Sequence, residues 1–314
     1  MSSAICTLFE GNYHYGVAAL TNSLYANGYR GEIYAGYRGS LPTWCDARKL
    51  NSAIGWDNAS TFDVAQGLVI HFLPLNTEYH LTNYKPEFML HIWNRCGVRV
   101  DSIAYFDPDI VIKCDWMFFE RWMSHGVALV HDLTDNDMPQ SHPIRLEWKK
   151  IISNYSASVK REVNSYINAG FCGVSKEHID FLHTWQFFIE KAVSDYSMDP
   201  RTMTSFHKTH PFCFLDQDAL NITAMCSEAL VSEMGPAGMD FVHGGWTMSH
   251  ALGSPKPWKK SYLSLALLAQ SPSLADKEFW LNTKYPINLF SAIHYKWKKL
   301  SILFASFFSR FYSR

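Results

Sequence analysis

The stretch SIAYFDPDIVI, residues Ser102–Ile112, predicts one buried strand that carries two carboxylates. Its apolar run ends where Asp107 and Asp109 stand two residues apart, with Pro108 between them. Strand alternation sends both side chains to one side, and a proline at the strand edge bends the chain. Two carboxylates that converge in this way can share a divalent cation and leave positions open for phosphate oxygens. The stretch therefore predicts a metal site at the end of a buried strand.

Strand-like runs and helical patterns alternate on both sides of this stretch. Short apolar runs lie at Ala4–Phe9, Glu32–Tyr37, Gly67–Leu75, Val127–Val130 and Ala169–Val174. Apolar residues with helical spacing lie at Tyr13–Ala26, Phe88–Cys96, Trp116–Met123 and Glu177–Ser194. Such alternation predicts an α/β fold with a mostly parallel sheet covered by helices, whose ligands bind near the carboxyl ends of the strands.

The second half of the chain is less regular. The polar segment Asp132–His142 and the Gly- and Pro-rich segment Pro236–Pro257 predict loops that close over a site. A further helix is expected to begin near Asp218, with this aspartate as its N-cap.

Charge is unevenly distributed along the 314 residues. The net charge of −1 argues against a general nucleic-acid-binding protein, which needs broad positive charge. From Lys256 to the C-terminus, ten Lys and Arg residues against two acidic residues leave +8, so residues 1–255 carry −9. An acidic body with a basic, aromatic tail predicts a catalytic domain that docks on an anionic surface.

The tail Ile293–Arg314 combines Lys296, Lys298 and Lys299 with the apolar run Leu300–Phe308. This run is too short to cross a bilayer but can lie in its surface, with the lysines facing anionic headgroups. The chain otherwise lacks a signal-peptide pattern or a run near the ~20 apolar residues of a membrane span. Seven scattered cysteines argue against a disulfide scaffold. We therefore expect a cytoplasmic protein that touches the membrane peripherally.

The paired aspartates are compatible with two chemistries. In a sugar-nucleotide glycosyltransferase, a cation held by Asp107 and Asp109 grips the diphosphate of the donor. In a haloacid-dehalogenase-type phosphatase, Asp107 is the nucleophile and Asp109 the general acid. The phosphatase motif normally lies on the first strand, whereas here three predicted strands precede it.

Other segments favour the first chemistry. NAGFCGVS (Asn168–Ser175), FLDQDALN (Phe214–Asn221) and HALGSPKPW (His250–Trp258) follow the paired aspartates in this order. With these segments and the start at Ile5–Asn12, the chain resembles the family 8 glycosyltransferases, retaining enzymes of the GT-A fold. The motifs together cover roughly residues 4–258.

The resemblance implies how a metal and the donor diphosphate would be held. Asp107 and Asp109 would bind Mn²⁺, or Mg²⁺, with His250 as the third protein ligand. A neutral imidazole beside two carboxylates favours Mn²⁺ because of its chemical softness. Lys256, in the same motif as Gly253, would contact the diphosphate while the bond between sugar and phosphate breaks.

The resemblance also implies a position for the nucleotide and the sugar. Lys85 occupies the place of a basic residue that contacts the donor phosphate or sugar. Asp216 and Gln217 would lie beside the anomeric carbon as catalytic candidates, through either a covalent intermediate or same-face attack by the acceptor. The remaining donor-binding residues that the resemblance implies are Thr7, Leu8, Glu10, Asn12, Tyr13, Pro108, Asp132, Asn168 and Ala169.

These observations combine into one expectation. Residues 1–258 would form a GT-A glycosyltransferase domain, and residues 259–314 a helical, basic-aromatic segment that docks on a membrane or a partner. The enzyme would move galactose or glucose from a UDP-hexose to a glycan or lipid-linked saccharide, as in lipopolysaccharide biosynthesis, at the inner face of the cytoplasmic membrane. The phosphatase and a catalytically silent UDP-sugar-binding protein stay open as alternatives.

Overall fold

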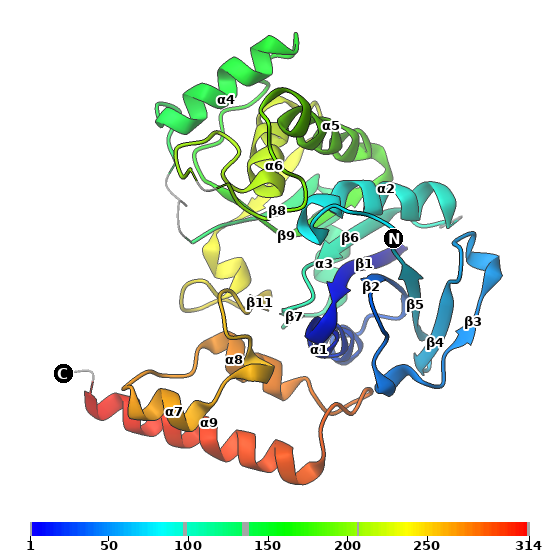
Figure 1. The fold of residues 1–314 in the computed structure, drawn as a ribbon, viewed down its shortest axis with the longest axis vertical. Coiled ribbons are helices and arrows are strands. Elements are labelled where there is room, and N and C mark those ends of the chain that lie inside the picture. The colour runs from blue at the N-terminus through cyan, green and yellow to red at the C-terminus, as the bar shows by residue number, and fades with distance from the viewer. Residues whose placement is uncertain (1, 97–98, 134–137, 206, 313–314) are drawn as a thin grey trace.

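A large mixed sheet forms the centre of the computed structural model, which describes residues 2–96, 99–133, 138–205 and 207–312 (Figure 1). Seven of its nine strands in the described residues run in one direction; β9 and β4 oppose them. This confirms the expected α/β fold with a mostly parallel sheet. In spatial order the strands are β10 (Val231–Met234), β8 (Val127–His131), β9 (Ile167–Ser175), β6 (Ser102–Phe106), β1 (Ser3–Glu10), β2 (Gly31–Arg38), β5 (Leu68–Pro74), β4 (Ser60–Ala65) and β3 (Lys49–Leu50).

Helices cover both faces of the sheet. Along β1, Cys6 and Leu8 face one core, whereas Ile5 and Phe9 face the other, so the strand is buried on both sides as a central parallel strand should be. One face is packed by α1 (His14–Ala26) and α3 (Trp116–Ser124). The other face is packed by α2 (Lys85–Arg95), α4 (Pro143–Asn154), α5 (Asp180–Asp195) and α6 (Leu215–Cys226).

The expected single strand Ser102–Ile112 is wrong in one respect, because the chain leaves the sheet after Phe106. Pro108 has no N–H to continue a ladder, and the Ile110 N–H turns back to the Asp107 carbonyl at 3.0 Å. The chain then enters β7 (Ile110–Ile112), which pairs antiparallel with β11 (Met248–His250) in a separate sheet. The segment Pro236–Pro257 is therefore not entirely a loop.

Two further expectations need comment. The helix expected near Asp218 begins earlier, at Leu215, so Asp218 is not its N-cap. Its carboxylate instead accepts the N–H of Phe214, the residue before the helix, at 2.7 Å. In the expected loop Asp132–His142, residues 134–137 lie outside the described residues.

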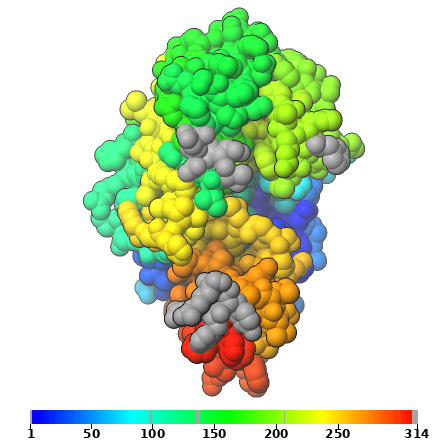
Figure 2. Space-filling model, turned by 90° about the vertical axis from the view of Figure 1, so that its left-hand side faces the viewer, coloured from blue at the N-terminus to red at the C-terminus, as the bar shows by residue number. Residues whose placement is uncertain are grey.

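The C-terminal helices pack against the body at the end of the molecule opposite α4 (Figures 1 and 2). They are α7 (Tyr262–Leu267), α8 (Leu274–Leu281) and α9 (Ala292–Tyr312). Their inner side chains share a core with Ala19 of α1 and Val111 of β7. None of the helices in the described ranges has the length and hydropathy to cross a membrane.

The same helices leave apolar side chains in solvent, which we call the C-terminal apolar surface. On α9, Leu303 is 64% exposed and Trp297 is 67% exposed; on α7, Leu267 is 89% exposed. Solitary exposed leucines are common, whereas a concentration of this kind is typical of interaction surfaces. The surface consists of Leu263, Leu267, Leu268, Ile293, Trp297, Leu300, Leu303, Phe304 and Phe307.

Candidate active site

Two carboxylates and one imidazole converge where β6 leaves the sheet. The His250 Nε2 atom lies 3.3 Å from Asp109 Oδ1 and 3.9 Å from Asp107 Oδ2. One potential ligand atom from each residue lies within 4.8 Å of the others. Asp109 and His250 are buried and Asp107 is partly covered. Oxygen and imidazole nitrogen ligands in this arrangement fit a divalent cation such as Mn²⁺. We call this group the cation cradle.

The pairing of β7 with β11 brings the cation cradle together. His250 lies opposite Ile110 in the antiparallel register, so a residue distant in sequence comes to stand beside Asp109. Two glycines make the required space. A Cβ atom on Gly170 would lie 2.6 Å from His250 Cε1, and one on Gly16 would lie 2.0 Å from the Pro108 carbonyl oxygen. Both positions therefore need glycine for the cradle to keep its shape.

Two lysines hold the outer oxygens of the paired aspartates. Lys85 Nζ lies 3.2 Å from Asp107 Oδ1 and 2.9 Å from Asp216 Oδ2. It also donates to the Ala169 carbonyl at 3.0 Å. Lys256 pairs with Asp109 Oδ2. Lys85 is buried and begins α2, a position where the helix dipole disfavours a cation, so the carboxylates offset both costs.

The two aspartates differ in their proton affinity. Burial raises the pKa of Asp107, and attraction to Lys85 and His250 offsets this only in part. Burial also acts to raise the pKa of Asp109, but His250 and Lys256 outweigh it and hold that pKa below the usual aspartate range. Burial acts to lower the pKa of Lys256, yet Asp109 raises it overall. The cradle therefore holds a firmly ionised Asp109 beside a more readily protonated Asp107.

A hydrogen-bonded network extends from the cradle along β9 and α6. Asn168 Nδ2 donates to Asp132 Oδ2 at 2.6 Å, and Gln217 Nε2 donates to the same oxygen at 3.2 Å. The Ala169 N–H donates to Gln217 Oε1 at 3.0 Å. Through Lys85, Asp216 joins this group, so five residues expected to line a sugar pocket lie in one network: Asp132, Asn168, Ala169, Asp216 and Gln217.

The N-terminal candidates divide into two groups. Thr7 and Leu8 are buried inside β1 and paired with β2, so the structure does not expose either of these predicted donor-binding residues. Glu10, Asn12 and Tyr13 lie past the buried part of that strand and are more accessible, and Glu10 forms an ion pair with Arg38 at 2.9 Å.

Tyr13 connects this end of the sheet with the cradle. Lys256 Nζ lies 5.8 Å from its ring centroid, and the Trp258 ring packs edge-on against it at 5.6 Å. Gly253 lies between His250 and Lys256 with φ of +75°, in the left-handed region that favours glycine.

Sequence reasoning missed Arg38, Gly16 and Gly170. Gly16 gives no signal in a single sequence, and Gly170 gives only its place in the NAGFCGVS motif, because the role of both depends on which atoms an added Cβ would contact. Arg38 directly follows the predicted strand Glu32–Tyr37, and its partner at Glu10 follows from the parallel register between β1 and β2. Opposite charges at the ends of two neighbouring strands are a signal that could have identified the pair of Glu10 and Arg38.

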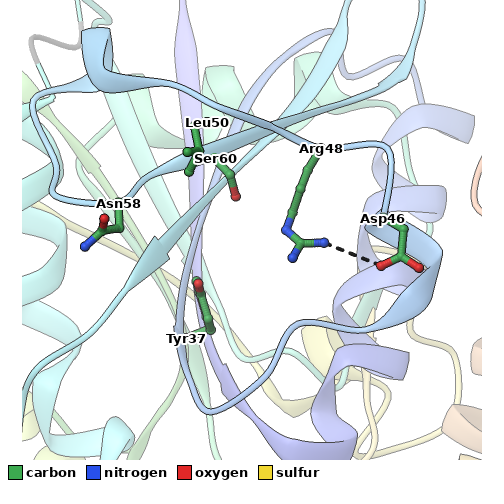
Figure 3. A pocket seen from close by; sticks show the side chains of 6 residues that line it. All are labelled: Tyr37, Asp46, Arg48, Leu50, Asn58 and Ser60. Carbon is green, nitrogen blue, oxygen red and sulfur yellow. Dashed lines mark ion pairs between the residues drawn. The ribbon is translucent and has the colours of Figure 1, made fainter.

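A cavity of about 540 Å³ lies elsewhere, between the end of β2 and the outer strands (Figure 3). Arg48 and Asp46 form an ion pair across part of it at 3.5 Å, and its side chains include none of the cation cradle. We assign it no catalytic role. Its lining residues are Tyr37, Asp46, Arg48, Leu50, Asn58 and Ser60.

Comparison with solved structures identifies the fold. The chain superposes on the glycosyltransferase GlyE of Streptococcus pneumoniae TIGR4 with a TM-score of 0.51 and 14% identity, covering 96% of this chain and 64% of GlyE. It superposes on the galactosyltransferase LgtC, solved with donor and acceptor sugar analogues, with the same score and identity, covering 94% of this chain and 99% of LgtC. The chain has a glycosyltransferase fold. This confirms the fold expected from the sequence motifs, whereas neither a family model nor a curated protein sequence matches the chain.

Proposed function

We propose that this protein is a metal-dependent retaining glycosyltransferase that moves galactose or glucose from a UDP-hexose to a hydroxyl group of a glycan or lipid-linked saccharide. One observation carries the proposal: the cation cradle and the network around Asp216 share Lys85 as a common partner. A cation site for a diphosphate and a polar pocket for a sugar therefore adjoin each other, as transfer from a sugar nucleotide requires.

The residues of the cradle would hold the donor through its diphosphate. Asp107, Asp109 and His250 would bind Mn²⁺, or Mg²⁺, and the bound cation would supply charge neutralisation for the departing UDP. Lys256 would turn its ammonium group from Asp109 toward the diphosphate. Tyr13 lies next to that lysine, where its ring can pack on the base or ribose.

The network would orient the sugar. Asp132 and Asn168 provide hydrogen-bonding groups for sugar hydroxyls, and a bound sugar would rest against them. Asp216 and Gln217 would act at the anomeric carbon, either as nucleophile or by stabilising positive charge during same-face attack. Lys85 keeps the Asp216 carboxylate oriented by a bond of 2.9 Å.

The phosphatase alternative meets a chemical objection in this structure. It needs Asp109 as a general acid, and a general acid must carry a proton at the working pH. His250 and Lys256 instead hold the pKa of Asp109 below the usual range, despite its burial. This supports a metal ligand in preference to a proton donor at this position.

We further propose that residues 293–314 contact the inner face of the cytoplasmic membrane, where a lipid-linked or lipopolysaccharide acceptor would be found. Ile293, Trp297, Leu300, Phe304 and Phe307 repeat at intervals of three and four, so they form one stripe along α9. All five are exposed. Exposed lysines lie on the same helix, at Lys296 and Lys299. An apolar stripe with flanking cations suits an anionic bilayer surface.

The test of transferase activity is UDP release from a panel of UDP-sugars with Mn²⁺, Mg²⁺ or EDTA. We expect slow Mn²⁺-dependent hydrolysis of one donor, lost in Asp109→Asn and His250→Ala but retained in Asp57→Asn and His183→Ala, which alter exposed residues outside the site. Calorimetry on the same samples measures donor binding. Binding without hydrolysis would favour the silent binding protein unless an acceptor restores turnover, and no binding of any UDP-sugar would overturn the proposal.

A further inference from the structure

We propose that Tyr105 is a positioning residue that presents Asp107 to the cation. The inference rests on the proposed metal site and adds a residue that acts on the cation through a ligand, without touching the cation itself. Tyr105 stands two residues before Asp107 at the end of β6, so strand alternation directs both side chains to the same face. Its hydroxyl group donates a hydrogen bond to Asp107 Oδ1 at 2.8 Å.

The two oxygens of Asp107 have different surroundings. Oδ1 accepts from the Tyr105 hydroxyl and lies 3.2 Å from Lys85 Nζ. Oδ2 is the atom that faces His250 Nε2, at 3.9 Å. Asp109 shows the same division, with Oδ2 on Lys256 and Oδ1 toward His250. In both aspartates the outer oxygen is occupied by a donor, so the inner oxygen is directed at the cation position.

Tyr105 supplies this restraint from a rigid base. Its ring is buried and lies between Cys6 of β1 and Cys172 of β9 in the sheet register, so the direction of the hydroxyl group is fixed by packing. Lys85 Nζ lies 5.3 Å from the centroid of the same ring. The tyrosine therefore supports both the aspartate and the lysine that flanks it.

Lys85 alone cannot give Asp107 a fixed orientation. Its ammonium group also serves Asp216 at 2.9 Å and the Ala169 carbonyl at 3.0 Å, so its position depends on the sugar pocket as well as on the cradle. A hydroxyl donor directed at one carboxylate oxygen provides a restraint that does not change when the sugar pocket fills. Partners of this kind orient metal ligands and raise metal affinity.

The test is Mn²⁺ binding to the full chain without donor, measured from the free-ion signal in electron paramagnetic resonance. Tyr105→Phe keeps the ring and removes the hydroxyl, and we expect about tenfold weaker Mn²⁺ binding. The control is Tyr155→Phe, which removes a tyrosine hydroxyl from a different aspartate, Asp195 Oδ2 at 2.6 Å, on the surface. Melting in EDTA checks that both variants fold. With an active donor, Tyr105→Phe should raise the KM for Mn²⁺ and leave kcat at saturating Mn²⁺ nearly unchanged.

The outcomes separate this inference from the proposed function. Weaker binding in Tyr105→Phe alone, with an unchanged melting temperature, supports the positioning role. Wild-type affinity in Tyr105→Phe, or an equal loss in Tyr155→Phe, overturns the role while leaving the metal site intact. Failure of the wild-type chain to bind Mn²⁺ overturns the metal site itself, and with it both proposals.

Discussion

The cation cradle buries charged groups, whereas the C-terminal apolar surface exposes apolar groups, and both differ from the usual arrangement of a globular domain. The cradle encloses charge: Asp109 and His250 are buried, and the flanking Lys85 is 2% exposed. The C-terminal surface exposes apolar groups, among them Leu267 at 89%. Globular proteins ordinarily bury apolar residues and expose charges, so both regions are unfavourable for an isolated domain.

The difference between the regions lies in what compensates each cost. In the cradle, partners within the chain compensate it, because lysines pair with both aspartates. On the C-terminal surface, Leu267 and Leu303 are largely exposed, and an exposed apolar concentration of this kind favours a bound surface as the source of compensation. The cradle is therefore a preformed site, whereas under our proposal the C-terminal surface completes its contacts on docking.

The strongest way to break this comparison is to displace one ligand of the cradle. In Gly170→Ala the new Cβ would lie 2.6 Å from His250 Cε1 and 2.8 Å from Asn168 Oδ1, so the imidazole must move. We expect Mn²⁺ affinity to fall about 100-fold, measured by titration calorimetry. Gly173→Ala on the same strand is the control, because its Cβ would crowd Met123 and Ala128 at a similar distance, and neither residue belongs to the cradle. Unchanged Mn²⁺ affinity in Gly170→Ala would exclude His250 as a ligand.

A smaller effect is expected when a charge enters the C-terminal apolar surface. Burial of a leucine side chain contributes roughly 1.5–3 kcal/mol, so Leu303→Glu should weaken sedimentation with anionic vesicles about tenfold or more. Leu267→Glu tests whether α7 shares in the contact. Leu50→Glu is the control, since Leu50 is a leucine on β3 with 82% exposure and lies outside the C-terminal helices. Equal loss of binding in all three variants would show that net charge alone governs vesicle binding, which would contradict apolar docking.

The sequence predicted the six inner strands of the sheet, β1, β2, β5, β6, β8 and β9, because they are largely buried. It missed β3, β4 and β10, which lie at the two sides of the sheet and are more exposed. A continuous apolar run such as Ala4–Phe9 predicts a buried strand without knowledge of its neighbours. The observed strand β1 extends this run by one residue at each end. The paired aspartates were also evident, since their chemistry lies in two residues close together. The local sequence was therefore sufficient to predict features formed by residues close together in the chain, such as a buried strand or the pair of aspartates.

The remaining features depend on contacts between distant segments. The pairing of β7 with β11 is specified by residues more than a hundred positions apart, and β11 lies inside a segment with loop composition. The requirement for glycine at Gly16 arises only when α1 meets the Pro108 turn. The leucines of α7 form part of a surface only because α7 packs on α9. No pattern within one segment encodes such relations.

Acidification should weaken Mn²⁺ binding by the cradle without weakening vesicle binding by the C-terminal surface, and this is the smallest of the expected effects. Burial raises the pKa of Asp107, with Lys85 and His250 offsetting part of the rise, so this carboxyl group binds a proton at a higher pH than an ordinary aspartate with a pKa of about 3.9. A protonated carboxyl group is a poor cation ligand, so Mn²⁺ affinity should decline as the pH falls toward the pKa of Asp107. The apolar side chains of the C-terminal surface do not titrate, so vesicle binding should not decline with Mn²⁺ affinity.

Parallel Mn²⁺ titrations and vesicle sedimentation between about pH 7 and about pH 5 measure the two affinities. A joint decline would mean that the two regions unfold together, whereas loss of Mn²⁺ binding alone would assign the proton to the cradle.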